Sequence, residues 1–314
     1  MLSGGRQANH ASVATRELIH EVARRLGYSP NQAARALRQK QSKLIAILDA
    51  TNFSSYSPQI LKGINDVLRK NQCQQMHCIF DSDKDLKEQM KSLETFRPDG
   101  WIVVGYLSKE VQEVISKKIS LGYEIIQVCS TIVLDGASAV YVDPYDIGSM
   151  AAEFFLANGH RHVLYAAVGQ GERCLLGFQD VFARQGLEFL ACCFQEEYGV
   201  SEEYGKNILR NWIRRGKKET AIFAFNDVVA AGIIAEAARN HVRIPQDLSV
   251  LGVDDQFFCS LLSPSLSTVR LPQYDRGVLV GEMLMRRLQF TPKLPPEIQN
   301  MSPVIAERES TCKN

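Results

Sequence analysis

The sequence predicts an α/β protein of two lobes, each built on an open parallel sheet with helices on both faces. Short apolar runs alternate with longer helical patterns along most of the chain, as in repeated β-α-β units. The alternation restarts near residue 140, which indicates a second sheet of the same kind. With 314 residues, 45% of them hydrophobic, the chain can bury the cores of about two domains.

The N-terminal segment has a different character. Residues 1–11 are polar and Gly-rich, and Ser12 can cap an amphipathic helix from about Val13 to Leu26 that Gly27 ends. A second helix is expected to start at Ser29, with Pro30 in its first turn. At about ten residues it is too short to be stable alone and needs a partner.

Charge is distributed unevenly along the chain. Residues 1–43 hold eight Lys and Arg against two Glu, whereas the remainder holds 28 basic and 33 acidic residues. A basic arm on a mildly acidic body is typical of a protein that binds nucleic acid. The second helix either contacts nucleic acid or is a solvated linker, and its residues alone do not decide between these two roles.

From Lys43 onward the elements follow in order. Continuous apolar runs predict strands buried on both faces, and amphipathic stretches predict the helices between them. For the first lobe we expect strands at 44–48, 76–80, 100–104 and 124–128 and helices at about 58–70, 84–96 and 108–121. For the second we expect strands at 140–143, 163–167, 187–194, 221–225 and 248–253, helices at about 145–157, 174–185, 201–215 and 227–240, then a helix at about 274–289 and a strand at 303–306.

Several classes of protein are excluded or disfavoured. No stretch approaches the roughly 20 apolar residues of a membrane span, and the N-terminus lacks the apolar core of a signal peptide, so we expect a cytoplasmic protein. Eight scattered cysteines without zinc-finger spacing predict free thiols and no metal site. No phosphate loop, zinc-protease or serine-hydrolase motif occurs, so we expect neither an enzyme nor a cofactor.

The stretch Leu26-Gly27-Tyr28-Ser29-Pro30-Asn31, followed by Ala33-Ala34-Arg35-Ala36-Leu37, resembles the junction of headpiece and hinge helix in the Lac repressor and galactose repressor family of bacterial transcription regulators. The resemblance implies a periplasmic-binding-protein-like effector domain over nearly all of residues 43–310. It also implies that Leu37 is the wedge that enters a DNA minor groove. The DNA-contacting residues that it implies are Asn9, His10, Tyr28, Asn31, Ala34, Leu37 and Arg38.

This sequence departs from the family pattern at its start. The first two headpiece helices, including the recognition helix that reads the major groove, are absent. Met1-Leu2-Ser3-Gly4 matches the family's Val-Leu-x-Gly except at its first position. We therefore expect that the start was assigned at an internal codon and that a full headpiece is encoded upstream. If the truncation is real, the alternative is a sugar-binding protein without autonomous specific DNA binding.

A second resemblance concerns the ligand site. Leu251-Gly252-Val253-Asp254-Asp255 and Leu262-Ser263-Pro264-Ser265-Leu266-Ser267-Thr268-Val269 are similar to the family's signature of two acidic residues after a strand followed by a Pro-rich turn. Arg173 before Gly177-Phe178, and Asn226-Asp227 after a strand, also match. The effector-binding residues implied are Ser55, Tyr56, Val142, Arg173, Tyr198, Asn226 and Asp254, although Asp254 could instead cap a turn, Arg173 form a surface ion pair and Val142 belong to the core.

These observations predict a DNA-binding transcription regulator, a repressor, that acts on operator DNA as a homodimer. Its affinity would be controlled by a small effector between the lobes: a sugar or sugar acid, with a purine ranked after them. We expect a residual headpiece (1–28), a hinge helix (29–42) and an effector domain (43–314). The first lobe would comprise 43–142 and 272–292, and the second 143–271 and 293–314.

Overall fold

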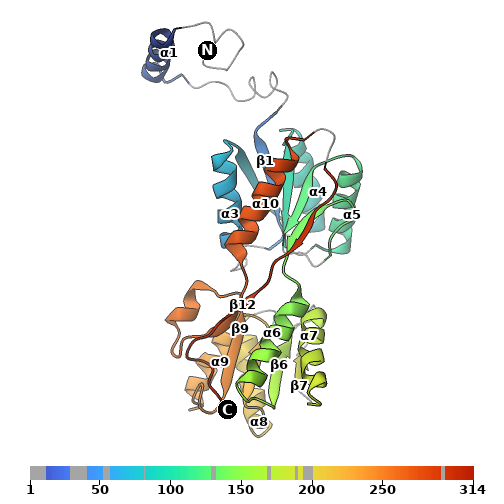
Figure 1. The fold of residues 1–314 in the computed structure, drawn as a ribbon, viewed down its shortest axis with the longest axis vertical. Coiled ribbons are helices and arrows are strands. Elements are labelled where there is room, and N and C mark those ends of the chain that lie inside the picture. The colour runs from blue at the N-terminus through green and yellow to red at the C-terminus, as the bar shows by residue number, and fades with distance from the viewer. Residues whose placement is uncertain are drawn as a thin grey trace.

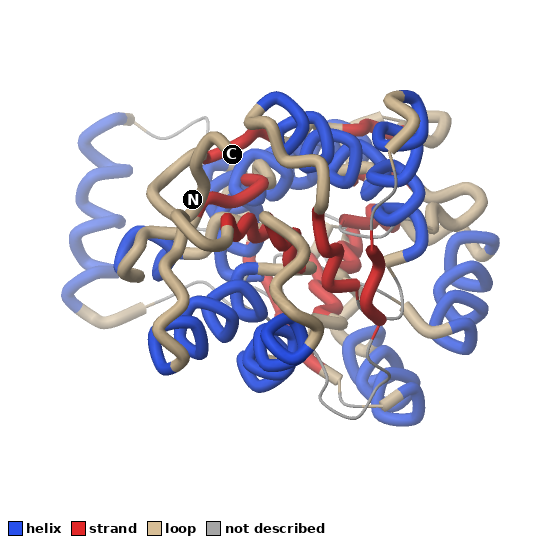
Figure 2. The backbone as a smooth tube through the Cα atoms, turned by 90° about the horizontal axis from the view of Figure 1, so that it is seen from below, coloured by secondary structure: helices blue, strands red, loops and turns tan. Residues whose placement is uncertain are grey.

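The computed structural model describes residues 12–28, 41–51, 57–80, 82–105, 107–128, 132–167, 171–187, 190–193, 201–290 and 294–314. Two six-stranded sheets form two lobes stacked along the long axis of the molecule, and helix α1 lies apart from both (Figure 1). Seen along that axis, the strands lie in the middle and the helices around them (Figure 2). The predicted two-lobed α/β fold is confirmed.

The first lobe is a parallel sheet with strand order β11-β5-β4-β3-β1-β2. Its strands are β1 (Leu44–Asp49), β2 (Gln74–Ile79), β3 (Gly100–Val104), β4 (Ile125–Val128), β5 (Ser138–Tyr141) and β11 (Ile298–Asn300). Helices α3 (Ser57–Lys70) and α10 (Gln273–Arg287) pack together on one face, and α4 (Asp83–Glu94) and α5 (Lys109–Ser120) on the other. Because strand side chains alternate, Ile45 and Ile47 meet α3 while Ala46 and Leu48 meet α4.

The second lobe repeats this arrangement with strand order β12-β10-β9-β8-β6-β7, in which only the β10–β12 pair is antiparallel. Its strands are β6 (Val163–Ala167), β7 (Leu190–Cys193), β8 (Ala221–Ala224), β9 (Ser249–Val253), β10 (Ser267–Arg270) and β12 (Val304–Ala306). The helices are α6 (Pro144–Ala157), α7 (Glu172–Arg184), α8 (Glu202–Arg214) and α9 (Asp227–Arg239). A short 3-10 helix, η2 (Phe257–Leu261), follows β9.

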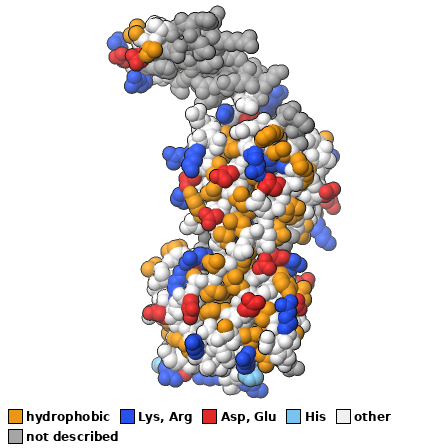
Figure 3. Space-filling model, in the orientation of Figure 1, with side chains coloured by type: hydrophobic (Ala, Val, Ile, Leu, Met, Phe, Trp, Pro, Cys, Tyr) orange, Lys and Arg blue, Asp and Glu red, His pale blue; other side chains and the backbone are white. Residues whose placement is uncertain are grey.

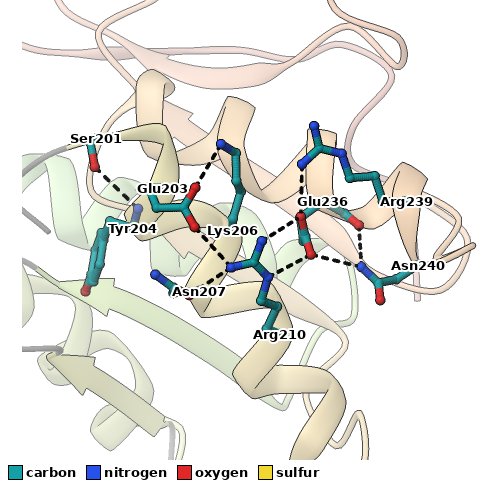
Figure 4. A network of polar contacts seen from close by, with 9 residues as sticks. All are labelled: Ser201, Glu203, Tyr204, Lys206, Asn207, Arg210, Glu236, Arg239 and Asn240. Carbon is teal, nitrogen blue, oxygen red and sulfur yellow. Dashed lines mark hydrogen bonds and ion pairs between the residues drawn. The ribbon is translucent and has the colours of Figure 1, made fainter.

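Helices α8 and α9 are fixed against each other by two kinds of contact. Their backbones approach so closely that a Cβ at Gly205 would lie 2.0 Å from the Val229 carbonyl oxygen. On the same two helices, Arg210 donates from Nε to Glu236 (2.8 Å) and from a terminal nitrogen to Glu203 (3.0 Å) (Figure 4). The close packing and the ion network together set the axial position of α8 on α9.

The chain crosses between the lobes three times, after β5, after β10 and after β11. The sequence placed all of residues 293–314 in the second lobe, and the structure corrects this assignment. Strand β11 pairs with β5 in the first lobe, with Ile298 opposite Ala139, so the third crossing follows Asn300. A three-residue edge strand is too short for a hydrophobic period to reveal it.

Helix α1 (Val13–Arg25) is capped by Ser12, whose hydroxyl accepts a hydrogen bond from the Thr15 amide (3.2 Å). Its apolar side is uncovered: Val13, Leu18 and Leu26 are 70%, 60% and 73% exposed. A single amphipathic helix cannot bury its apolar face on its own. No helix within the described ranges is both long and apolar enough to cross a membrane.

Candidate functional site

The carboxyl ends of the second-lobe strands lie at the boundary between the lobes. Strand β10 leads directly through Pro272 into α10 of the first lobe, and β9, β8 and β6 run parallel to β10 or to each other. In this register Phe223 lies opposite Leu251, and Asn226 and Asp254 each come three residues later. Arg173 follows β6 in the first turn of α7. Three residues singled out in the sequence therefore share one edge, which we call the interlobe cluster: Arg173, Asn226 and Asp254.

Arg173 is held by an ion pair at the first crossing. Its Nε lies 2.6 Å from Asp143 Oδ1, and its guanidinium lies 5.9 Å from the centre of the Tyr145 ring. The Arg173 guanidinium holds the pKa of Asp143 below its usual value, although partial burial opposes this. A cation in the first turn of a helix opposes the helix dipole, so α7 itself gains nothing from Arg173. Its side chain is 57% exposed and keeps donors free for another partner.

The resemblance implies that Asn226 reaches the ligand and that Asp227 can cap the next helix, whereas in the structure the cap is Asn226. Asn226 caps α9, since its side-chain oxygen accepts a hydrogen bond from the Val229 amide (2.9 Å). Asp227 is fully buried and accepts hydrogen bonds from the Thr268 hydroxyl (2.6 Å) and the Gln256 amide (2.7 Å). Asp227 therefore ties α9 to β10 and to the loop after β9, while Asn226 remains partly exposed.

Asp254 has an unusual backbone conformation, with φ of +106°. Residues other than glycine rarely adopt this conformation, and such strain is concentrated at functional sites. Burial raises the pKa of the Asp254 carboxyl well above its usual value, the nearby Asp227 carboxylate raises it further, and Arg276 partly offsets both. The neighbouring Asp255 instead points to Arg270 (2.5 Å) and Arg308 (2.6 Å). A carboxyl that favours its protonated form can donate a hydrogen bond as well as accept one.

The other predicted residues are placed differently. Val142 is only 5% exposed and packs in the core of the second lobe, which favours the core role left open for it. Tyr28 follows α1 and is 59% exposed. The remaining predicted residues lie outside the described part of the chain: Asn9, His10, Asn31, Ala34, Leu37, Arg38, Ser55, Tyr56 and Tyr198.

Sequence reasoning missed two residues beside the interlobe cluster. The sequence could have indicated Asp143, since a carboxylate that follows a strand and precedes Pro144 is a common helix cap. In the structure the Asp143 side chain accepts a hydrogen bond from the Tyr145 backbone amide (2.9 Å). Arg276 gave no signal, because a basic residue in the first turns of a helix is ordinarily exposed. In the structure it is 4% exposed.

A cavity of about 550 Å³ lies at the opposite end of the first lobe. Its lining includes Asp99 and Trp101 at the start of β3, Glu124 before β4 and Arg287 at the end of α10. These are the amino ends of the strands, whereas ligands of open α/β sheets bind at the carboxyl ends. No group of three side chains suited to a metal ion occurs among the described residues.

The fold has known counterparts. The sequence family described as the periplasmic binding protein-like domain matches residues 137–311. The chain belongs to this family. Within the family it is of the Lac repressor and galactose repressor type, as its similarity to repressors of this type indicates.

Individual relatives agree with this placement. The ribose operon repressor of Bacillus subtilis is 27% identical over 91% of this chain and 86% of its own length. A probable HTH-type transcriptional regulator, EndR of Paenibacillus polymyxa, is 24% identical over 97% and 92%. The structure of the Lac repressor dimer bound to operator and the anti-inducer ONPF superposes with a TM-score of 0.83, at 20% identity over 98% and 94% of the two chains.

Proposed function

We propose that this periplasmic binding protein-like family member is a DNA-binding transcription regulator whose affinity for DNA is set by a small effector bound between its lobes. The observation that carries the proposal is the interlobe cluster: Arg173, Asn226 and Asp254 reach one edge of a sheet from three different strands. Their donors and acceptors match the hydroxyl groups of a sugar or sugar acid. The named functions of the relatives, a ribose operon repressor and an operator-bound Lac repressor, support it.

The mechanism rests on linkage between the two binding events. The two lobes can take two relative positions. An effector that contacts both lobes binds one of these positions more tightly than the other, and it shifts the protein towards that position by the difference in affinity. The first lobe carries residues 29–42, the proposed hinge helix, at its N-terminus. A shift of the lobes in a dimer changes the spacing of two hinge helices and thereby the affinity for DNA, and the DNA changes effector affinity by the same factor.

A homodimer is part of the proposal. The 3-10 helix η2 exposes two large apolar side chains, Phe257 at 82% and Leu261 at 74%. Exposed apolar side chains of this size, close together on one element, are typical of a protein interface. Two copies are also what a palindromic operator requires, because the symmetry of the DNA site mirrors that of the protein.

Substitution of Asp254 by glycine tests the effector site. Glycine adopts the φ of +106° without strain, so Asp254→Gly removes the carboxyl without disturbing the backbone. A panel of neutral sugars, sugar acids and purines is screened by thermal shift, because a ligand of the native state raises Tm. We expect at least one compound to raise the Tm of the wild type and to have at least tenfold lower affinity for Asp254→Gly.

The Tm of the free protein serves as the control in this experiment. Relief of backbone strain should leave the free Asp254→Gly protein at least as stable as the wild type. Equal binding by both proteins would remove Asp254 from the site, and a panel without any stabilising compound would count against an effector-binding function.

A further inference from the structure

Arg276 is a buried cation whose hydrogen-bonding capacity is mostly unused. Its side chain is 4% exposed, and one terminal nitrogen donates to Gln273 Oε1 (2.8 Å), one turn earlier in α10. Nε has no acceptor, and no carboxylate in the described ranges lies within ion-pairing distance. Burial of an unpaired charge is costly, so a protein that retains one forgoes stability at that position.

Arg287, the other buried arginine of α10, has hydrogen-bond acceptors for its guanidinium within the first lobe. Arg287 is 6% exposed, forms an ion pair with Glu124 and donates to the carbonyl oxygens of Pro295 (2.6 Å) and Leu294 (2.9 Å). Its guanidinium is thus satisfied on every side by the first lobe. Arg276 lies on the same helix at the same depth and lacks an equivalent set of acceptors.

The position of Arg276 follows from the direction of α10. The last turn of α10 lies at the amino ends of the first-lobe strands, because Arg287 pairs with Glu124 before β4 and Leu284 lies against Gly100 at the start of β3. From Arg276 to Arg287 the helix rises roughly 16 Å, at about 1.5 Å per residue. A five-residue strand covers about the same length. Arg276 therefore lies at the carboxyl ends of the strands, facing the second lobe.

The electrostatics place Arg276 beside the interlobe cluster. Its positive charge lowers the pKa of Asp254, against the larger effects of burial and of Asp227, so the guanidinium and this carboxyl are close across the lobe boundary. Two other charged groups nearby have ion-pair partners: Arg173 pairs with Asp143, and Asp255 pairs with Arg270 and Arg308. Among the described residues at this edge, Arg276 is a buried cation without a carboxylate partner. The amino end of α10, one turn away, adds to the positive potential.

We propose that Arg276 is a specificity residue of the interlobe site and binds an oxyanion, the carboxylate or phosphate of an acidic sugar. The proposal rests on the proposed effector-binding function and narrows it from sugars in general to anionic ones. A guanidinium with free donors binds such a group through two parallel hydrogen bonds. Asp254, whose pKa is raised by burial, would face the sugar hydroxyls beside the anion.

The test compares matched pairs of compounds on matched variants. Aldonic acids, uronic acids and sugar phosphates are each tested beside their neutral parent sugar, for example D-glucuronate beside D-glucose and D-ribose 5-phosphate beside D-ribose. Thermal shift identifies the compounds that bind, and titration calorimetry measures their affinities. The proteins are wild type, Arg276→Met, Arg276→Lys and Arg287→Met, where the last removes a buried arginine of the same helix that is fully paired.

We expect an acidic compound to bind the wild type at least tenfold more tightly than its neutral parent. Arg276→Met should abolish this preference, and Arg276→Lys should retain part of it because it keeps the charge. Without ligand, Arg276→Met should have a Tm equal to or above that of the wild type, since it removes an unpaired buried charge. Arg287→Met should lower Tm by several degrees or fail to fold, because it leaves Glu124 buried without its partner.

Several results would overturn the inference. The wild type could bind the neutral parent sugars as tightly as the acidic compounds, or more tightly. Arg276→Met could keep the wild-type preference for acidic compounds. Arg276→Met could also lower Tm by as much as Arg287→Met does. A panel without any acidic compound that binds would overturn it too. If a neutral sugar binds the wild type and this binding is lost in Asp254→Gly, the proposed function stands and only the inference about Arg276 falls.

Discussion

The side chain of Asp227 makes the stability of the folded protein depend on pH. Its carboxyl is fully buried, and no cation among the described residues pairs with it. Burial raises its pKa to about 6, although hydrogen bonds from Thr268 and Gln256 partly oppose the shift. Between pH values of about 4 and 6 the folded protein thus holds a proton that the unfolded chain releases. This contribution makes the folded state less stable as pH rises through that range.

Asp227→Asn should flatten the dependence of stability on pH. A shift of about two pKa units corresponds to roughly 3 kcal/mol between the two protonation states, and asparagine cannot titrate. The free energy of unfolding, measured by denaturant titration from pH about 4 to about 7, should fall less steeply for Asp227→Asn than for the wild type. Parallel profiles for the two proteins would show that this carboxyl does not titrate as described.

A second variant controls for the loss of a carboxylate as such. Arg243 donates hydrogen bonds to Asp247 and holds the pKa of that carboxyl at about 2. Its folded-state pKa is lowered, so the stability that it contributes is lost only as pH falls towards this value. Asp247→Asn should therefore leave the slope between pH about 5 and about 7 unchanged.

At the residue scale, the sequence predicts the place of a side chain well when that side chain directly follows a strand. The resemblance to the family's motifs implied Arg173, Asn226 and Asp254, and the structure brings them together because residues that follow parallel strands gather at one edge of a sheet. That Asn226 and not Asp227 caps α9 could not be predicted, because both residue types cap helices and only packing against Thr268 decides which is buried. The burial of Arg276 likewise depends on tertiary contacts that its own position does not reveal.

At the scale of elements, the pairing of α3 with α10 depends on two glycines. A Cβ at Gly63 would lie 2.2 Å from the Tyr274 carbonyl oxygen and 2.7 Å from the Val278 nitrogen, and one at Gly277 would lie 2.0 Å from the Ile60 carbonyl oxygen. These neighbours are backbone atoms, which cannot move aside without separating the helices. The close approach also fixes the first turns of α10, which carry Arg276.

Gly63→Ala should therefore destabilise the protein by a few kcal/mol, as overpacking of a close contact does. Gly100→Ala is the matched control in the same lobe, since the three atoms nearest to its Cβ would belong to the movable side chain of Leu284, and the substitution should cost less. Urea denaturation of both variants measures the difference. Equal losses would mean that the α3–α10 contact adapts more freely than the structure indicates.

Elements with a full hydrophobic period were predictable, and short edge strands were not. β1 and β3 read as continuous apolar runs because both of their faces are covered. β11 pairs along only one edge and has three residues, two of them exposed, so nothing in Ile298–Asn300 distinguishes it from a loop. The last crossing between the lobes follows β11. Because β11 was not predicted, we predicted this crossing at the wrong place.

At the scale of the whole molecule, the arrangement joins a basic arm to a two-lobed body. Both signs of charge are interspersed on the face of the lobes shown in Figure 3, and the molecule narrows where the lobes meet. The excess of basic residues before residue 44 gives a DNA complex a steep dependence on salt. The interlobe cluster lies at the far end of the first lobe from that arm, so control of DNA binding requires the first lobe to transmit a change of position.

The coupling between the two sites is the central claim, and fluorescence anisotropy of the full-length chain on labelled DNA from its own promoter measures it directly. Kd is determined with and without a compound that stabilises the wild type, for the wild type and for Asp254→Gly. We predict that the compound changes the Kd of the wild type at least fivefold, and that Asp254→Gly binds DNA as the wild type does but loses this response. A Kd that the compound leaves unchanged in the wild type, or changes equally in Asp254→Gly, would contradict the account.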